Sequence, residues 1–459
     1  MKAKMINVLI VIGIFTGFMI SGAAVPAKVQ AASRDFIVAV QKIPPVMEPM
    51  RVNSNVHMRI LYNVGESLLK IDYKHGLKIV PSLAAEWKRL DDKTIEFKLR
   101  RGVKFHNGEE MTSADVAFTF GEERFFHKKR GWTLAQMYLG NINPPKVIDR
   151  YTVQISSKRT DFLLEKRLAS YMSEIISKKA FLAAKDWETW SRNIVCTGPY
   201  KLVEIKSGDY IRLEAFDQYW GAKAPVRSIT FKSIPEVAAR VAGLKTGEYQ
   251  IITEVPPDQL KSIDSYQGIS SVGGPIPNIR AVQIDTTNEV LKSKEIRQAM
   301  AMAIDRQLIV DSLYHGRTNV PNGFQVKMSG EMWIEDYRGL SYDPKKAKEL
   351  IRKSGYKGET IHYRVQPDYY TLEVATAEIL VEMWKAVGLK VKMDMADNWS
   401  QVLKNDEPRH LVNMSHSVFY SDPEGILWRR LGPKSPFRFK NIYGGKAPFC
   451  DVPKEFDEW

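Results

Sequence analysis

The sequence predicts an α/β protein with more than one domain. The chain has 459 residues, of which 44% are apolar, and this length exceeds what one hydrophobic core usually accommodates. In the C-terminal half, a helical pattern over residues 372–387 is followed by an alternating strand pattern over residues 389–395. Helices that alternate with strands in this way are typical of an α/β domain.

A strand, a turn and a helix are predicted one after another between residues 95 and 120. Apolar and charged residues alternate over 95–99, which is the period of a half-buried strand. An Asn-Gly dipeptide at 107–108 predicts a tight turn. Thr112 and Asp115 have the spacing of a helix-start signal and precede an apolar run, so a helix is predicted to begin there.

The remaining elements of the N-terminal half follow from the same two periodicities. Strands are predicted at 36–40, 153–155, 201–205, 210–215 and 229–231, with Lys206-Ser207-Gly208-Asp209 as a hairpin turn. Helices are predicted at 58–61, 163–184 and 235–247, where Pro235 opens the last helix and Gly247 ends it. Residues 132–145 are predicted to form a loop-rich insertion.

In the C-terminal half, Gly273-Gly274-Pro275 is the predicted crossing to a second lobe. A strand is predicted at 282–284, and one amphipathic helix at 295–313. Asp343 and Pro344 predict the start of a further helix, because Asp caps helices and Pro suits the first helical position. Gly355 is predicted to end that helix, and Gly388 to end the helix at 372–387.

The first 31 residues have the pattern of a secretory signal peptide. Lys2 and Lys4 precede an apolar run from Met5 to Ile20, and Ala31 or Ala32 offers a small-residue cleavage site. The run is shorter than the ~20 residues of a membrane span. No cysteine stands at the cleavage region, so a lipid anchor is not indicated. We therefore expect a periplasmic protein.

Charge and cysteine content leave several interpretations open. The formal net charge of +14 fits a solvated basic surface, attraction to an acidic ligand, or attraction to an anionic membrane. There is no zinc-finger spacing, arginine-rich tract or RNP-like motif, so we do not expect a nucleic-acid partner. Cys196 and Cys450 could pair in an oxidising compartment, or they could be two small buried residues.

Residues 79–120 also form one long and specific string, which reads IVPSLAAEWKRLDDKTIEFKLRRGVKFHNGEEMTSADVAFTF. This string resembles the signature segment of the family 5 extracellular solute-binding proteins, the peptide, nickel and glycoside receptors of bacterial ABC importers. Further resemblances follow in the family's order at residues 197–200 (TGPY), 219–221 (YWG), 296–310 (IRQAMAMAIDRQLIV) and 342–356 (YDPKKAKELIRKSGY). The resemblance covers about residues 36–457.

The resemblance implies a bilobal α/β fold of the periplasmic-binding-protein type, class II-like, with an extra subdomain in lobe one. We expect a signal peptide at 1–31, lobe one at 32–275 with an inserted subdomain at about 70–188, and lobe two at 276–459. The chain is expected to lack the C-terminal elements that return to lobe one in the family. Such receptors close over a solute between the lobes, and the closed state is read by a permease.

From this resemblance we expect a monomer that binds a small solute, most commonly a peptide or peptide-like molecule in this family. The expected partner is an ABC permease complex in the inner membrane. Eight residues are ligand-binding candidates, chosen from family position and residue type: Asn53, Asn55, Trp132, Arg280, Trp399, Phe419, Tyr420 and Asp422.

The candidate residues depart from the family at one place. Peptide receptors of the family have an acidic residue a few positions before an Asp-Pro pair, and that residue binds the peptide amino group. Asp422-Pro423 matches the pair, but Phe419 stands where the acid is expected, so Asp422 or Glu424 would have to substitute. Arg280 suits an anionic ligand. The aromatic candidates are alternatively core residues, and Asp422 is alternatively a helix cap.

Motifs of common enzymes are absent from the sequence. There is no G-x-S-x-G, H-E-x-x-H, P-loop or G-x-G-x-x-G string, so no catalytic residue and no cofactor is expected. His410 and His416 lie six positions apart, which is not ligand spacing on one helix face, so we do not expect the family's nickel role. Two alternatives remain: a secreted hydrolase, which needs a catalytic cluster in one pocket, and a chaperone-like periplasmic binder of unfolded segments.

Overall fold

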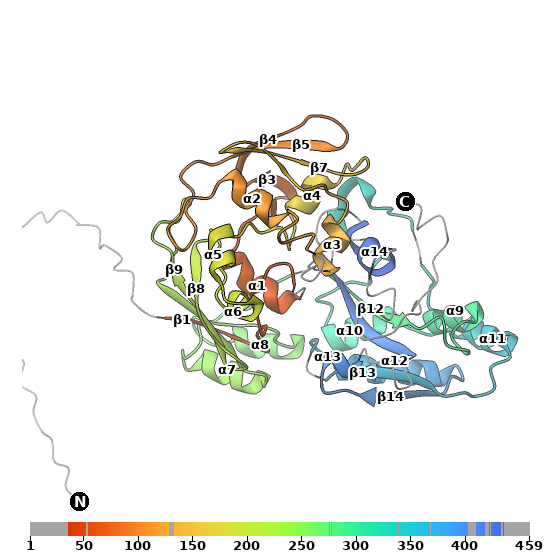
Figure 1. The fold of residues 1–459 in the computed structure, drawn as a ribbon. Helices are drawn as coiled ribbons and strands as arrows, with labels where there is room; N and C mark the ends of the chain where they lie inside the picture. Colours follow the sequence, from red (N-terminus) through yellow and green to blue (C-terminus); the bar gives the residue numbers. More distant parts are fainter. Residues whose placement is uncertain are drawn as a thin grey trace, which may run out of the picture. The chain divides into compact units, whose positions relative to one another are not determined.

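The computed structural model describes residues 35–435 except 52–53, 128–132, 275, 277, 326, 338, 368, 403–409, 418–421, 423 and 433–434. Two large groups of buried apolar side chains organise this part of the chain. The first core contains residues between Val38 and Phe231, and the second core contains residues between Leu291 and Leu411. Each core is built on sheets of its own (Figure 1).

A five-stranded sheet with the order β11-β1-β10-β9-β8 belongs to the first core. β1 pairs in parallel with β10 and β11, whereas β9 is antiparallel to both of its neighbours. Val38, Ala39 and Val40 are buried, as expected for an apolar strand inside a sheet. The bounds are β1 Phe36–Val40, β8 Tyr200–Lys206, β9 Tyr210–Ala215, β10 Ser228–Ser233 and β11 Ile251–Ile252.

The predicted strand at 95–99 lies in a second, antiparallel sheet of the first core, with the order β4-β5-β7-β6. Ile95, Phe97 and Leu99 face the core while Glu96 and Lys98 face outward, which confirms the alternating pattern. A hairpin of β2 and β3 precedes this sheet. The bounds are β2 Leu69–Asp72, β3 Lys78–Pro81, β4 Ala84–Arg89, β5 Thr94–Leu99, β6 Lys146–Asp149 and β7 Thr152–Ser156.

Helices cover these sheets, and their ends follow local capping chemistry. The Asp115 carboxylate accepts the Thr112 N–H at 3.0 Å, so the predicted start signal does begin α2. The bounds are α1 Asn55–Val64, α2 Ser113–Thr119, α3 Thr133–Leu139, α4 Leu164–Leu168, α5 Lys178–Ala183, α6 Trp187–Arg192, α7 Val237–Lys245 and α8 Pro257–Asp264.

The second core is built on a four-stranded sheet with the order β12-β15-β13-β14. β12 is antiparallel to β15, and β13 is parallel to both β14 and β15. α12 packs along β13 and β14 (Figure 1). The strand bounds are β12 Asn278–Ile284, β13 Ile361–Val365, β14 Val391–Met395 and β15 Leu411–Ser417.

The helix at 344–354 has both predicted ends. The Asp343 side chain accepts the Lys346 N–H at 2.8 Å, and Gly355 has a left-handed backbone with φ of 74°. The helices of this region are α9 Lys294–Met302, α10 Arg306–Tyr314, the 3₁₀ helix η1 Lys327–Met332, α11 Pro344–Ser354, α12 Glu373–Ala386, α13 Trp399–Val402 and α14 Glu424–Leu431.

The prediction of a single helix over 295–313 is wrong. α9 ends at Met302, and α10 begins at Arg306. The Asp305 carboxylate accepts the Leu308 N–H at 2.9 Å, which caps a new helix. The Arg306 guanidinium donates to the Ala301 carbonyl at 3.1 Å, so it satisfies an acceptor exposed at the end of α9. Two local caps therefore outweigh a continuous amphipathic pattern.

Two further predictions need correction. Residues 163–184 form two short helices, α4 and α5, because Met172 has a positive φ of 76° and the Ser173 hydroxyl donates to the Leu168 carbonyl at 3.0 Å. The predicted loop-rich segment contains α3, whose Met137 and Leu139 are buried in the first core. Burial of apolar side chains decided the structure there. The helix expected from Pro235 begins two residues later, at Val237.

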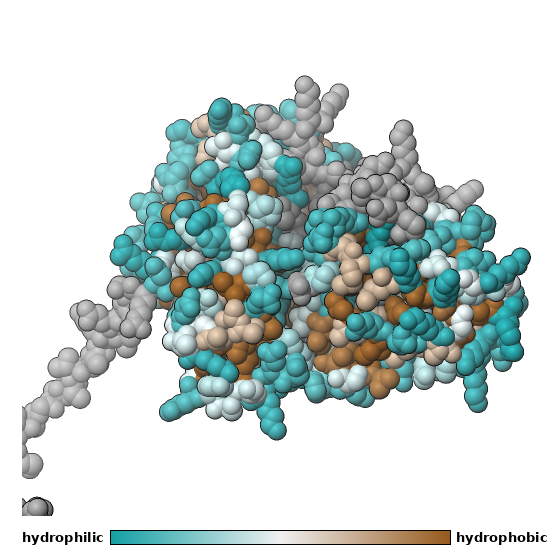
Figure 2. Space-filling model, turned by 90° about the horizontal axis from the view of Figure 1, so that it is seen from below, coloured by the Kyte–Doolittle hydropathy of each residue, from teal (hydrophilic) through white to brown (hydrophobic). Residues whose placement is uncertain are grey.

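Hydrophilic residues cover most of the face seen from below, with apolar patches between them (Figure 2). Among the residues that the structure describes, no helix combines the length and apolarity needed to cross a membrane. Cys196 is a free thiol buried in the first core, and Cys450 lies outside the described residues.

Candidate functional site

Three polar contacts join residues near the first core to residues of the second sheet and its flanking loops. Asn55 lies 3.5 Å from Ser417, measured from the amide oxygen to the hydroxyl oxygen. The Lys42 ammonium stands 5.9 Å from the centre of the Tyr369 ring. The Lys166 ammonium lies 3.2 Å from the Asp422 carboxylate. These contacts bring together the segments in which the candidate residues occur.

Asn55 is presented by the start of α1. The Ser54 hydroxyl accepts the His57 N–H at 3.2 Å and caps the helix, so the first helical residue is held at the surface. Asn55 is exposed, and its amide oxygen accepts from the Ser417 hydroxyl at the end of β15. A separation of 3.5 Å is the outer limit of a hydrogen bond, so this contact positions the two segments weakly.

Arg280 is held on β12 by a buried acid and an aromatic ring. Its Nη2 donates to Glu373 at 2.7 Å, and its guanidinium carbon lies 4.0 Å from the centre of the Tyr370 ring. The other oxygen of Glu373 accepts the Asn413 side-chain N–H at 3.0 Å. Burial raises the pKa of Glu373, and Arg280 together with Asn413 opposes that effect. The Glu373 side chain is 3% exposed, whereas that of Arg280 is 28% exposed.

Trp399 belongs to an aromatic group with two tyrosines that follow β13. The Trp399 ring lies edge-on to Tyr369 at 4.8 Å and to Tyr370 at 6.1 Å between centroids. Trp399 also packs against a small apolar cluster that includes Val412 and Met414. Its indole N–H is buried and has no hydrogen-bond acceptor among the described residues. The Trp399 ring therefore packs against apolar side chains, and its indole N–H is still able to donate a hydrogen bond.

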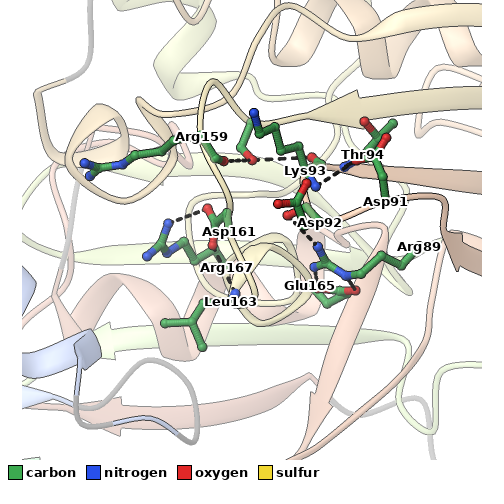
Figure 3. A network of polar contacts seen from close by, with 11 residues as sticks. Arg89, Asp91, Asp92, Lys93, Thr94, Arg159, Asp161, Leu163, Glu165 and Arg167 are labelled. Atoms are coloured by element: carbon green, nitrogen blue, oxygen red, sulfur yellow. Dashed lines mark hydrogen bonds and ion pairs between the residues drawn. The ribbon is translucent and has the colours of Figure 1, made fainter. Parts of the chain in front are cut away.

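Asp422 is buried and paired with Lys166, rather than presented as an open carboxylate. Its side chain is 10% exposed. Lys166 is carried by α4, whose orientation is fixed by ion pairs on either side (Figure 3). Glu165 pairs with Arg89, which is anchored in β4, and the Arg167 guanidinium donates to Asp161 at 2.6 Å. Asp422 therefore acts as a link between two segments of the chain.

The structure brings four of the eight candidates into this region: Asn55, Arg280, Trp399 and Asp422. Arg280 and Trp399 both contact Tyr370, whereas Asn55 and Asp422 contact other residues. Asn53, Trp132, Phe419 and Tyr420 lie outside the described residues. Sequence reasoning did not select Lys42, Glu373, Tyr369 and Tyr370. The Tyr-Tyr pair was detectable, because it lies just before the helix predicted at 372–387.

Buried ionisable residues also lie within the part of the chain that forms the first core. Glu48 accepts from Arg124 and from the Trp190 indole, and all three side chains are buried. Glu174 is also buried, and one of its carboxylate oxygens has no partner among the described residues. Burial raises the pKa of Glu174 to about 8, with a smaller contribution from Glu48 in the same direction and an opposing one from Arg124. Glu174 is consequently a neutral acid at pH 7.

The histidines show no arrangement for metal binding. Within the described ranges, no group of three or more His, Cys, Asp or Glu residues is placed to hold a metal ion. His106 lies 3.1 Å from the Gly198 carbonyl, and burial lowers its pKa to about 4, so it is a structural contact. An open depression of about 590 Å³ lies between α12 and β14, but none of the candidate residues lines it.

Comparison with known proteins assigns the family. The model of the bacterial extracellular solute-binding proteins, family 5 (middle) matches residues 78–436. The chain is 28% identical over 385 residues to the dipeptide-binding protein of Escherichia coli, which covers 78% of this chain and 71% of that protein. It is 24% identical over 447 residues to the probable ABC transporter periplasmic-binding protein SapA of Escherichia coli, which covers 92% of this chain and 80% of that protein.

Solved structures show the same fold. The periplasmic binding protein DppA of Helicobacter pylori in complex with the peptide STSA has a TM-score of 0.79 at 21% identity, covering 87% of this chain and 81% of that chain. The dipeptide-binding protein of Pseudoalteromonas sp. SM9913 in complex with Met-Leu has a TM-score of 0.80 at 20% identity. The match covers 90% of this chain and 85% of that chain. These likenesses confirm the predicted bilobal α/β fold. The chain therefore belongs to the family 5 bacterial extracellular solute-binding proteins, which are transport receptors and not enzymes.

Proposed function

We propose that this receptor binds a peptide or peptide-like solute in the periplasm and delivers it to an ABC permease complex in the inner membrane. The relatives' names favour this solute class, since they include dipeptide-binding proteins and a structure with a bound peptide. Solute binding shifts a two-lobed receptor toward its closed state, and a permease can distinguish the closed state from the open one.

The observation that carries the proposal is the position of β15 beside the aromatic group. β13 pairs with β15 at Leu411 and Val412, whereas β15 continues to Ser417. Along this continuation the Tyr370 hydroxyl accepts the Ser415 N–H at 2.9 Å, so a side chain stands beside the strand edge. An extended peptide binds such an edge through its main chain while aromatic residues contact its side chains. Asn55, Arg280, Trp399 and Asp422 are the proposed site residues among those described.

The domain boundaries are part of the same proposal. We place lobe one at 32–275, with the inserted subdomain at about 70–188, and lobe two at 276–459, after a signal peptide at 1–31. Two separate cores, within Val38–Phe231 and Leu291–Leu411, support a division between them. The antiparallel sheet of β4 to β7 supports the inserted subdomain. We further propose that the receptor is a monomer.

A thermal-shift screen of the mature chain tests the proposed solute. The panel contains di- to pentapeptides, opines, glycosides, nickel chelates and polyamines. A ligand at one hundred times its dissociation constant stabilises the folded state by about 2.7 kcal/mol, which raises the midpoint by several degrees. Peptides are expected to shift the midpoint, whereas a shift with glycosides or nickel chelates alone would contradict the proposed solute class.

A matched pair of variants tests the site. Asn55→Ala is expected to weaken binding of the best peptide, while Asn319→Ala, at another exposed asparagine, leaves it unchanged. Equal binding by both variants would place the peptide away from the start of α1.

Size-exclusion chromatography with light scattering, with and without ligand, tests the proposed monomeric state.

A further inference from the structure

The exposed side of α11 carries mainly positive charge. Its exposed ionisable side chains are Lys345, Lys346, Lys348, Glu349, Arg352 and Lys353. Glu349 pairs with Lys346 at 2.9 Å. Lys345, Lys348 and Arg352 have no ion-pair partner among the described residues. These three residues are three and four positions apart, so they lie along one side of the helix, and we call them the basic row.

α11 is held in place by α9, which lies beside it (Figure 1). The Asp343 N–H donates to the Met302 carbonyl at 2.9 Å, and this bond joins the start of α11 to the end of α9. Ala347 and Ile351 are buried in the second core, to which α9 contributes Met300. Because the apolar side of α11 is fixed in this way, the basic row faces solvent and keeps its spacing.

The acids at the ends of these helices already have partners. The Asp343 carboxylate accepts the Lys346 N–H at 2.8 Å and caps α11. Hydrogen bonds from its own N–H and from the Ser293 hydroxyl lower the pKa of Glu295, and the nearby Lys353 ammonium lowers it further. Glu295 therefore balances the charge of Lys353 and leaves the basic row uncompensated.

Exposed apolar side chains stand directly before α11. Tyr342 is 51% exposed and Leu340 is 45% exposed. A tyrosine ring with its polar hydroxyl suits the boundary between water and lipid, and lysine and arginine suit the negative charge of phospholipid headgroups. Cations beside an exposed aromatic ring thus match the chemistry of an anionic membrane surface, whereas a surface that only meets water gains nothing from the ring.

We propose that the basic row and Tyr342 bind the surface of an anionic phospholipid membrane. The cations of the row donate to lipid phosphates, and the Tyr342 ring lies among the headgroups. α11 stays packed on α9 and does not insert into the bilayer. The contact goes beyond solute binding, because it keeps the receptor at the membrane that holds the proposed permease. The net charge of +14 has the sign that attracts the chain to such a surface.

Cosedimentation with lipid vesicles tests the proposal. The protein is the mature chain, residues 32–459, because the apolar run at 5–20 would bind vesicles by itself. Vesicles of phosphatidylcholine mixed with phosphatidylglycerol are compared with vesicles of phosphatidylcholine alone. At about 0.1 M salt the mixed vesicles are expected to bind at least about tenfold more tightly, and the difference should disappear near 1 M salt, where the Debye length is about 3 Å.

Variants of the face assign the binding to its residues. The triple variant Lys345→Gln, Lys348→Gln and Arg352→Gln should lower the affinity for mixed vesicles by at least about tenfold, because each cation near an anionic surface contributes roughly fivefold. Glutamine is a good helix former, so α11 should remain folded, and circular dichroism checks this. Tyr342→Ser should weaken binding at low and at high salt, since the contribution of the ring is not electrostatic.

A second triple variant is the matched control. Lys223→Gln, Arg227→Gln and Lys261→Gln remove the same charge from exposed positions of other segments. This variant should keep the affinity of the natural chain to within about twofold, because screening confines the attraction to charges within about a Debye length of the membrane.

Two results would overturn the proposal. Equal losses in the two triple variants would mean that net charge, and not the basic row, attracts the vesicles. Absence of binding to the mixed vesicles would exclude the membrane as the partner of the row. Solute binding in the thermal-shift screen requires no vesicles, so the proposed peptide receptor succeeds or fails independently of both results.

Discussion

Replacing Glu174 by glutamine is expected to make the stability of this protein less dependent on pH between pH 5 and pH 8. Glu174 is 2% exposed, and one carboxylate oxygen has no partner among the described residues. A Cβ atom placed on Gly65, at the end of α1, would lie 2.9 Å from the Glu174 Cγ, so the side chain is closely packed. Water cannot enter to solvate a charge there without a rearrangement.

The magnitude follows from the two pKa values of this carboxyl group. Burial raises its pKa from 4.5 to about 8 in the folded protein. Between these values the unfolded chain releases a proton that the folded protein retains, so the free energy of unfolding decreases as the pH rises. The decrease is about 1.4 kcal/mol per pH unit, or roughly 5 kcal/mol over the whole interval. Stability from this group is complete below pH 4.5 and no longer changes above about pH 8.

Urea unfolding followed by circular dichroism measures the effect at pH 5, 6, 7 and 8. Glutamine carries no charge at any of these values, so the stability of Glu174→Gln relative to the natural protein should increase by about 4 kcal/mol from pH 5 to pH 8. A packing cost of the amide shifts all points equally. The other titratable groups are the same in both proteins, so their contribution cancels in the difference.

Glu123→Gln is the control, because the Glu123 side chain is 61% exposed and pairs only with the exposed Lys178 in the contacts described here. Its stability should run parallel to that of the natural protein over the same range. If the curves of Glu174→Gln and the natural protein were also parallel, Glu174 would titrate near its ordinary pKa. The account of a dry, neutral carboxyl group would then be wrong.

Three further substitutions are expected to reduce the free energy of unfolding, and urea unfolding measures each. Gly198→Ala places a Cβ atom 2.6 Å from the main chain of Val64, at the end of α1, so the free energy of unfolding should fall by about 1–3 kcal/mol. The control Gly274→Ala adds a Cβ atom in open space and should leave the free energy of unfolding nearly unchanged. Asp305→Ala removes the cap of α10 and should cost about 1 kcal/mol, with faster amide exchange in its first turn; unchanged exchange would contradict the capping role. Arg124→Met leaves the Glu48 carboxylate buried without its cation and should lower the free energy of unfolding by about 3–5 kcal/mol. The double variant with Glu48→Gln should recover part of that loss. A loss below about 1 kcal/mol in Arg124→Met would refute the role of the buried ion pair.

Local sequence predicted most elements whose signals lie within a few residues. The strand at 95–99 alternates as expected, the Thr112 and Asp115 pair begins α2, and the helix from Pro344 to Ser354 has both predicted ends. The two helix-end signals are contacts between residues close in the chain, so their energy depends little on the rest of the fold. The strand pattern is local in the sequence, but it becomes stabilising only when its apolar side is buried in the core.

Predictions from periodicity alone were less accurate. Residues 295–313 have one apolar face, yet Asp305 caps a second helix within them. An amphipathic pattern states which face is buried, but two helices packed on the same core satisfy it as well as one. In the segment from Leu163 to Ala184, the positive φ of Met172 is maintained by the surrounding core.

The sequence by itself determined the family and the chemical types present at the candidate site. Only the tertiary structure decided which of those residues meet. Arg280 and Ser415 become neighbours through the pairing of β12 with β15, and Lys166 reaches Asp422 because ion pairs orient α4. Contacts of this kind join segments far apart in the chain, so their formation depends on both cores being folded, and no local pattern encodes it.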